Sequence, residues 1–192
     1  MIKKGVFYLC LVFLCGCAYL SYIKGPFTDI PNFRKVDNIL YRGGQPRAKG
    51  WEKIQSMGIK TVISLRGENE ELLKEKELVE NKGMHFYNIA LSVYRQPAEK
   101  QVITFLEIIL TESNQPVFLY CNNGRDRTGA MVALYRVVVY GWTIKNSYRE
   151  ARKLGFWPYH GEEAVLKKFI HQLKDKKLYF DKAKELLYEK NH

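Results

Sequence analysis

From residue 37 onward, short apolar runs alternate with longer stretches in which apolar and charged positions are mixed. The short runs predict strands at 39–41, 61–65, 85–89 and 117–120. The longer stretches predict helices at 48–57, 68–82, 97–113, 128–140 and 143–154, with one or two more within 162–189. Strands interleaved with helices indicate an α/β fold, with a small central sheet flanked by helices.

The first 17 residues follow a different pattern. Lys3 and Lys4 precede an apolar stretch over 5–16, which is typical of a secretory signal. The stretch ends in Leu14-Cys15-Gly16-Cys17, which resembles the lipobox of bacterial lipoproteins; the resemblance implies cleavage before Cys17 and a lipid on that cysteine. An uncleaved membrane anchor is the alternative, because apolar residues continue to Ile23 and approach the roughly 20 residues that span a bilayer. Both interpretations of this segment predict a membrane-tethered protein whose folded part lies outside the cytoplasm, on the periplasmic side.

The remaining sequence is long enough for one domain. The chain has 192 residues, 46% of them hydrophobic, which suffices for a single packed core. We expect 18–36 to be a tether, 37–192 to be the folded domain, and the protein to be a monomer. The net charge of +11 attracts anions, such as a phosphorylated substrate or an anionic membrane surface. No nucleic-acid motif accompanies the basic residues, so nucleic acid is not an expected partner.

The strand predicted at 117–120 runs into a loop that combines a cysteine, a glycine and two arginines, Cys121-Asn122-Asn123-Gly124-Arg125-Asp126-Arg127-Thr128-Gly129. Loop amides and the N-terminus of the following helix favour an anion at one point, and the same field favours the thiolate form of a cysteine there. The guanidinium of Arg127 can grip two phosphate oxygens, and Thr128 can hydrogen-bond the sulfur. The segment therefore indicates phosphoryl transfer through a phosphocysteine.

Three other interpretations of Cys121 are weaker. A buried structural cysteine would not account for an arginine and a threonine at these spacings. A rhodanese-like sulfur carrier also places a cysteine before a helix, but Arg127-Thr128-Gly129 favours phosphate. A non-catalytic phosphate-binding module would have no need of the nucleophile. The other three of the four cysteines lie in the leader, so a disulfide within the domain is not expected.

Cys121, followed by Arg127-Thr128-Gly129 after a strand, resembles the signature of the cysteine-dependent phosphatases, the protein tyrosine and dual-specificity phosphatase superfamily. Leu40-Tyr41-Arg42-Gly43-Gly44-Gln45-Pro46 resembles the Tyr-Arg-x-x-Gln-Pro element of a compact bacterial, fungal and plant dual-specificity branch, and residues 61–66 fit its second strand. The resemblance covers about 37–173. It implies a phosphatase-type strand–phosphate loop–helix arrangement, a dual-specificity phosphatase-like catalytic domain and, by default, protein phosphotyrosine as the substrate.

The sequence departs from this family in its general acid. The family acid is usually an aspartate on a mobile loop, which corresponds to residues 90–96 here, and that loop has no carboxylate. Asp126 is the nearest candidate, because Cys-x-x-Gly-x-Asp-Arg-Thr is similar to the loop of phosphoinositide phosphatases such as the myotubularins. Asp126 could instead hold a neighbouring arginine. The similarity also opens a second substrate class, inositol polyphosphates or phosphoinositides.

Tyr120 is a second departure, because relatives carry histidine before the nucleophile; we expect it to have a packing role. The predicted catalytic residues are Cys121, Arg127, Asp126 and Thr128. The predicted phosphate-binding residues are Asn122, Asn123, Gly124, Arg125, Asp126, Arg127, Thr128, Arg42 and Arg95. For Arg42, positioning of the loop and a structural salt bridge are the alternatives to a substrate contact. No His, Cys or Asp cluster in the sequence suggests a metal, and the chemistry requires no cofactor.

Overall fold

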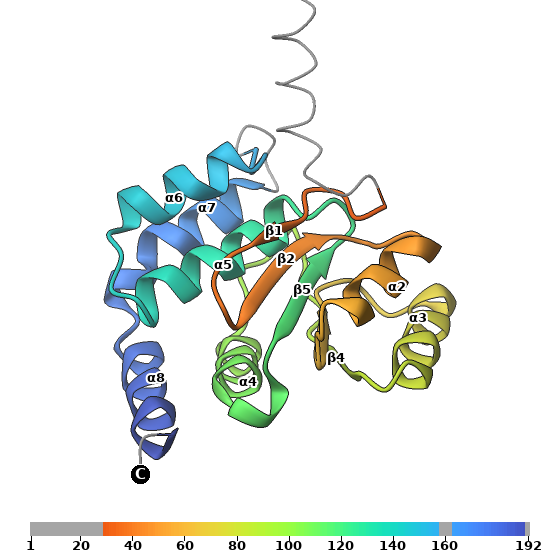
Figure 1. Cartoon of the computed structure of the whole chain (residues 1–192). Helices are drawn as coiled ribbons and strands as arrows, with labels where there is room; N and C mark the ends of the chain where they lie inside the picture. The colour runs from red at the N-terminus through yellow and green to blue at the C-terminus, as the bar shows by residue number, and fades with distance from the viewer. Residues whose placement is uncertain (1–28, 158–162, 191–192) are drawn as a thin grey trace, which may run out of the picture.

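The computed structural model describes residues 29–157 and 163–190, which form a sheet covered by helices on both faces (Figure 1). The strands are β1 (Arg34–Lys35), β2 (Leu40–Gly44), β3 (Thr61–Ser64), β4 (His85–Asn88) and β5 (Val117–Cys121). The α-helices are α2 (Ala48–Ser56), α3 (Glu70–Asn81), α4 (Glu99–Leu110), α5 (Asp126–Val138), α6 (Ile144–Lys153), α7 (Glu163–Gln172) and α8 (Lys177–Lys190). The predicted α/β class, a small central sheet flanked by helices, is confirmed.

The five-stranded sheet has the order β1-β2-β5-β3-β4. The pairings of β2 with β5, β5 with β3 and β3 with β4 are parallel, and only β1 runs antiparallel to its neighbour. Every residue of β3 and β5 is buried, as expected for central strands of a parallel sheet covered on both faces. The carboxyl ends of the parallel strands lie at one edge, where Gly44 is the partner of Cys121.

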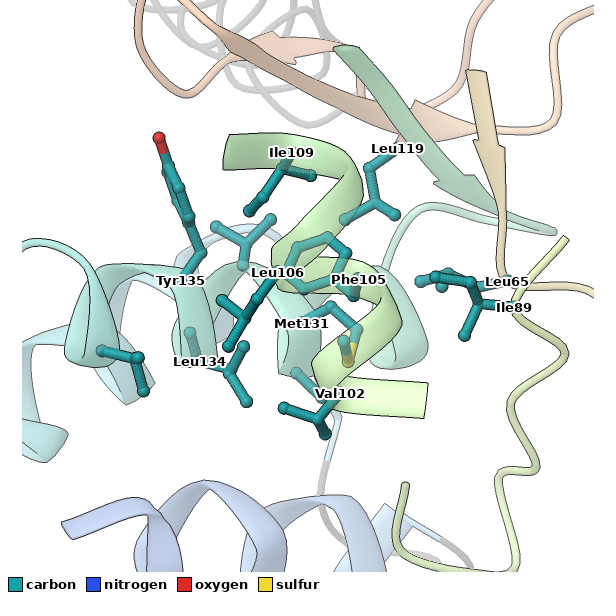
Figure 2. Close-up of a cluster of buried hydrophobic side chains, with 14 of the residues drawn as sticks. Leu65, Ile89, Val102, Phe105, Leu106, Ile109, Leu119, Met131, Leu134 and Tyr135 are labelled. Atoms are coloured by element: carbon teal, nitrogen blue, oxygen red, sulfur yellow. The ribbon is translucent and has the colours of Figure 1, made fainter. Parts of the chain in front are cut away.

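Two apolar layers enclose the sheet. The larger layer lies between the sheet and helices α4 to α8; Figure 2 shows its centre, where Phe105 and Leu106 of α4 meet Met131 and Leu134 of α5. Most of α5 is buried, so this helix is the inner element of the layer. The smaller layer packs Trp51 and other residues of α2 and α3 against the opposite face.

The boundary of the domain differs from the prediction. The tether was expected to reach residue 36, but Ile30 and Phe33 are buried in the smaller core layer, with exposed fractions of 0% and 4%. The short strand β1 then follows and pairs with β2. The fold therefore includes residues from about Asp29, since Ile30 lies against Gly43 of β2 and Phe33 stacks on Phe118 of β5.

Candidate active site

Cys121 is the last residue of the central strand β5, and its side chain is buried, with 3% exposed. A short loop separates it from α5, whose N-cap is Arg125 and whose first helical residue is Asp126. The helix therefore begins earlier than the predicted 128, and Arg127 and Thr128 belong to its first turn. The N-terminal end of α5 carries a positive partial charge beside the sulfur, an arrangement that favours anions.

The carbonyl groups of the loop are bound from outside. The backbone carbonyl of Asn122 accepts from the backbone N–H of Gln45 at 3.0 Å, and that of Asn123 accepts from Asn32 Nδ2 at 2.9 Å. The backbone carbonyl of Gly124 accepts from Arg42 Nη2. In a planar trans peptide the N–H group points away from the carbonyl. The amides that follow these three carbonyls therefore face the interior of the loop, where they form a concave anion site.

The segment Tyr41–Pro46 is the support on which this loop rests. Gly124 has φ +66°, and a Cβ atom there would lie 2.3 Å from the Gly43 carbonyl carbon and 2.4 Å from the Gly44 nitrogen. A Cβ atom on Gly44 would lie 2.8 Å from the Asn122 oxygen. The close approach of the two backbones thus requires glycine both in the loop and in β2. Arg42 and Gln45, which flank Gly43 and Gly44 in sequence, donate hydrogen bonds to the loop.

Arg127 and Thr128 are placed at the base of the loop. Arg127 Nη1 donates to the Leu65 carbonyl at 3.1 Å, so the half-buried guanidinium is fixed at one nitrogen. Thr128 is fully buried, and within the described residues its hydroxyl has no hydrogen-bond partner. Both groups therefore keep donors for a ligand in the loop, as the predicted roles in phosphate and thiolate stabilisation require.

Arg42 was expected among the phosphate-binding residues, but it lies on the outer side of the loop. Only 1% of it is exposed, and its bond to the Gly124 carbonyl makes it a positioning residue rather than a substrate contact. Burial lowers the pKa of Arg42 to about 10, and the nearby Cys121 thiolate opposes that decrease. A guanidinium with this pKa remains charged at neutral pH and adds positive potential near the sulfur.

A buried network that sequence reasoning missed lies behind the loop. Arg66 Nη1 donates to both oxygens of Glu75 at 2.9 Å, and Arg66 Nε donates to Asn122 Oδ1 at 3.0 Å. Glu75 also accepts from Tyr120 Oη at 2.7 Å and from Gln45 Nε2 at 2.5 Å. In the sequence, Arg66 only ends a strand-like segment, and Glu75 is one of many glutamates in α3, so no sequence signal distinguishes either residue.

The packing role predicted for Tyr120 is confirmed. Its ring stacks on Phe118, with ring centroids 5.8 Å apart, and meets the edge of Trp51 at 5.7 Å. Burial, followed by the charge of Glu75, raises the pKa of the Tyr120 hydroxyl, which keeps this group protonated as a donor. Tyr120 thereby connects the residue next to the nucleophile to the network behind the loop.

We expect replacement of Glu75 by glutamine to lower the free energy of unfolding by roughly 2–3 kcal/mol, because Arg66 would lose its buried charge partner and keep only the exposed Glu71. The side chains of Arg66 and Glu75 are 8% and 9% exposed, whereas that of Glu71, which also pairs with Arg66, is 60% exposed. Glu71→Gln is therefore the matched control and should change stability little. Urea denaturation of both variants measures the difference, and equal losses would show that Glu75 has no special structural role.

Asp126 lies in the first turn of α5 and is half-buried. Its Oδ1 accepts from the backbone N–H of Trp157 at 3.1 Å, and the backbone N–H of Asp126 itself also donates to this carboxylate. Burial raises the pKa of the Asp126 carboxyl; the Trp157 hydrogen bond and the charges of Arg125 and Arg127 oppose the increase. A raised pKa keeps the proton on this carboxyl to higher pH than on an exposed aspartate.

The loop over 90–96 begins beside Arg127, since the amide of Leu91 donates to the same Leu65 carbonyl at 3.3 Å. It brings no carboxylate to the site. Arg95 is exposed on this loop, and its predicted phosphate contact stays a prediction. Arg125 is also exposed, and its side chain lies across Gly155, because a Cβ atom there would be 3.3 Å from Arg125 Cγ and Cδ.

Within residues 29–157 and 163–190, no group of three or more His, Cys, Asp or Glu side chains is placed to hold a metal ion. Over the same ranges no helix combines the length and apolar character that crossing a bilayer requires. The predicted lipid attachment at Cys17 and the leader lie outside the described residues.

Comparison with known proteins identifies the family. The family described as DSP-PTPase phosphatase fused to NAD+ kinase matches residues 26–168, about three quarters of the chain. The chain belongs to this phosphatase family. It is therefore a cysteine-dependent phosphatase of the dual-specificity type, and the family expected from the sequence is confirmed.

Curated relatives of this phosphatase have different substrates in their names. The chain is 29% identical over 126 residues to "Probable tyrosine-protein phosphatase DG1060" of Dictyostelium discoideum, covering 64% of the chain and 75% of the relative. It is 27% identical over 132 residues to inositol diphosphatase SIW14 of Saccharomyces cerevisiae, covering 65% of the chain and 46% of the relative. It is 24% identical over 125 residues to dual specificity protein phosphatase TpbA of Pseudomonas aeruginosa, covering 65% of the chain and 55% of the relative. The chain thus spans about half of two of these proteins.

Solved structures share the fold. The crystal structure of P. aeruginosa TpbA superposes with a TM-score of 0.68 at 21% identity, over 82% of this chain and 95% of that one. The catalytic core of SIW14 from S. cerevisiae, in complex with citrate, superposes with a TM-score of 0.67 at 24% identity, over 83% of this chain and 93% of that one. These likenesses concern the arrangement of the sheet and helices, and they agree with the α/β architecture described above.

Proposed function

We propose that the chain hydrolyses phosphate monoesters through a phosphocysteine at Cys121, with protein phosphotyrosine as the substrate. The thiolate attacks phosphorus, the S–P bond forms, and the bond to the ester oxygen breaks. Asp126 gives its proton to the departing oxygen. Water then attacks the phosphocysteine, its proton passes to Asp126, and inorganic phosphate leaves with the thiolate restored.

The main support for this proposal is that three carbonyls of the loop accept hydrogen bonds from donors outside it. This arrangement turns successive amides toward one point next to the Cys121 sulfur, where the equatorial oxygens of the transferring phosphoryl group would lie. Arg127, held at Nη1 by Leu65, offers its remaining N–H groups to the same oxygens. The amides and the arginine are fixed before substrate binds, so stabilising the transition state requires little reorganisation.

A second substrate class, inositol polyphosphates, is favoured by a different observation. The loop over 90–96 brings no carboxylate, and Arg125 is exposed next to Asp126. A phosphate leaving group, as in a diphosphate, is already a weak base and needs less protonation than a phenolic oxygen. Two curated relatives are named inositol diphosphatases, which supports this alternative.

The experiment that tests the proposed function compares p-nitrophenyl phosphate, a phosphotyrosine peptide and an inositol phosphate that carries a diphosphate group as substrates of the full chain and of its Cys121→Ser variant. We expect wild-type cleavage that the variant lacks, with the phosphotyrosine peptide preferred. Preference for the inositol phosphate would select the second class. Binding of the substrates without cleavage of any of them by the reduced wild-type protein would instead indicate a phosphate-binding module.

The role of Asp126 as acid predicts a leaving-group effect. Asp126→Asn should lower kcat/KM, which reports the steps up to departure of the leaving group, about 100-fold for the phosphotyrosine peptide, and far less for p-nitrophenyl phosphate, whose leaving group departs without a proton. The asparagine oxygen can still accept from Trp157, so the structural contact is retained.

The pH dependence of phosphotyrosine peptide cleavage gives a second test of the acid role of Asp126. Burial raises the pKa of Asp126, so the acid form persists at low pH and is lost as the pH rises through that pKa. Cleavage of the phosphotyrosine peptide should therefore fall on the alkaline side in the wild type, and this limb should be missing in Asp126→Asn. Equal losses with both substrates and an unchanged limb would reduce Asp126 to a structural residue.

We also propose that the enzyme is a lipoprotein tethered outside the cytoplasm through Cys17. The leader sequence and the basic balance of the chain support the proposal. Expression of the full chain in a bacterial host with a labelled fatty acid should give a labelled protein, and Cys17→Ser should remain unlabelled and keep its leader. Label on the Cys17→Ser protein, or no label on either, would contradict this attachment.

A further inference from the structure

Cys121 has a neighbour on each side in the chain that is held by side chains outside the phosphate loop. Before it, the Tyr120 hydroxyl donates to a buried carboxylate of α3 at 2.7 Å. After it, Asn122 is bound twice: its backbone carbonyl accepts from the N–H of Gln45 at 3.0 Å, and its side-chain Oδ1 accepts from Arg66 Nε at 3.0 Å. The position of the nucleophile therefore depends on residues that do not belong to the loop.

Arg66 holds the Asn122 side chain from a fixed position. It is 6% exposed, and each of its three guanidinium nitrogens has a partner. Nε binds Asn122, Nη1 binds both oxygens of Glu75 at 2.9 Å, and Nη2 binds Glu71 at 2.7 Å. A planar fork that is bound on all sides leaves little freedom to the group that it grips.

The same two carboxylates of α3 also hold Gln45. Its Nε2 donates to Glu71 at 2.9 Å and to Glu75 at 2.5 Å, while its backbone N–H binds the Asn122 carbonyl. Asn122 itself is exposed, so these two bonds, and not burial, restrict its conformation. One bond at the carbonyl and one at the side chain together restrict the orientation of the peptide plane that follows this residue.

We propose that Arg66 is a positioning residue for phosphoryl transfer, which aligns the backbone N–H of Asn123 through its bond to the Asn122 side chain. The inference rests on the proposed phosphatase reaction. In the trans peptide this N–H points away from the Asn122 carbonyl, and so toward the oxygens of the transferring phosphoryl group. A misaligned donor weakens the transition state more than the ground state, so kcat should fall while KM changes little.

The test is a double-mutant cycle on the full chain with Arg66→Lys, Asn122→Ala and the two changes together. A lysine can keep the charge pair with Glu75, but its single nitrogen cannot also hold Asn122. Each single variant should lower kcat/KM for p-nitrophenyl phosphate about tenfold, which is part of the 100- to 1,000-fold that losing one such donor costs. The double variant should lose no more than either single variant, because both changes remove the same bond.

Three results of this cycle would overturn the proposal. Independent losses that multiply to about 100-fold in the double variant would show that Arg66 does not act through Asn122. A loss confined to KM would show an effect on binding instead of alignment. Activity of Asn122→Ala within about twofold of the wild type would show that the bond is not needed; this variant leaves the buried Arg66–Glu75 pair intact, so it is informative even if Arg66→Lys does not fold.

The matched control is Arg136→Lys. Arg136 also pairs with a glutamate, Glu150, at 2.9 and 3.2 Å, and donates to a further acceptor, the Val36 carbonyl, at 3.1 Å. Its side chain is 11% exposed, against 8% for Arg66. The control should lose stability in urea to a similar extent but keep kcat/KM within about twofold of the wild type. Equal losses of activity in Arg66→Lys and Arg136→Lys would overturn the proposal, because general loosening of the fold would then explain both.

Orthovanadate gives a readout that requires no turnover, because it can adopt the trigonal bipyramidal geometry of phosphoryl transfer. Its dissociation constant, measured by isothermal titration, should rise about tenfold in Arg66→Lys and in Asn122→Ala. A wild-type chain that cleaves no substrate would contradict the proposed function. Unchanged orthovanadate binding in both variants would contradict the positioning role, whether or not the chain turns over substrate.

Discussion

Replacing Arg127 by lysine is expected to lower kcat/KM for p-nitrophenyl phosphate by roughly 100- to 1,000-fold, although the positive charge is retained. The reason is geometric. One guanidinium nitrogen is bound to the Leu65 carbonyl, and the others remain for phosphate. A lysine ammonium is a single point on a flexible stem, so it cannot keep the Leu65 bond and grip two phosphate oxygens together.

Steady-state kinetics of Arg127→Lys measures this effect, with Arg149→Lys as the control. Arg149 lies exposed on α6, where its Nη1 donates to Asn146 Oδ1, and it makes no hydrogen bond to the phosphate loop among the described residues. The control should retain wild-type kinetics. A value of kcat/KM for Arg127→Lys within a few-fold of the wild type would show that charge alone, without the planar fork, accounts for phosphate binding.

The second large effect is expected for Gly124→Ala. The new methyl group would lie 2.3 Å from the Gly43 carbonyl carbon and 2.4 Å from the Gly44 nitrogen, and both obstacles are backbone atoms that cannot rotate away. Strain from the left-handed conformation costs about 1–2 kcal/mol, and the overlap adds roughly 1–3 kcal/mol. The loop must shift away from β2, and a displacement near 1 Å is enough to lower the catalytic rate about 100-fold.

Gly141→Ala separates the two causes. Gly141 has φ +67°, almost the same as the +66° of Gly124, but a Cβ atom there meets nothing within 4 Å. It should therefore show the conformational strain alone, with the activity unchanged. Urea denaturation and turnover of p-nitrophenyl phosphate distinguish the variants. Similar stability and activity of both alanine variants would mean that the glycine contact between the loop and β2 is not needed.

The sequence predicts the part of the site in which the functional residues are contiguous along the chain. The strand, loop and helix around Cys121 follow one another along the chain, and a short apolar run, a glycine and a helical stretch are local signals. The start of α5 was placed two residues late, because Asp126 and Arg127 resemble loop residues when read alone.

Long-range contacts account for what the sequence could not show. Arg42 was expected near substrate, and its place outside the loop depends on the pairing of β2 with β5 and on the bond to Gly124. The Arg66–Glu75 pair joins a strand end to the middle of α3, and nothing in the amino-acid pattern of that helix singles out Glu75. The end of the tether was misplaced for the same reason, since the burial of Ile30 depends on α2.

The proposed hydrolysis depends most on Cys121 as the covalent nucleophile. The most direct measurement is rapid acid quench of the full chain during turnover of p-nitrophenyl phosphate, followed by mass spectrometry of the peptide that contains Cys121. We expect one phosphoryl group on Cys121 in the wild type and neither adduct nor turnover in Cys121→Ser. Turnover that persists in Cys121→Ser would contradict the phosphocysteine mechanism.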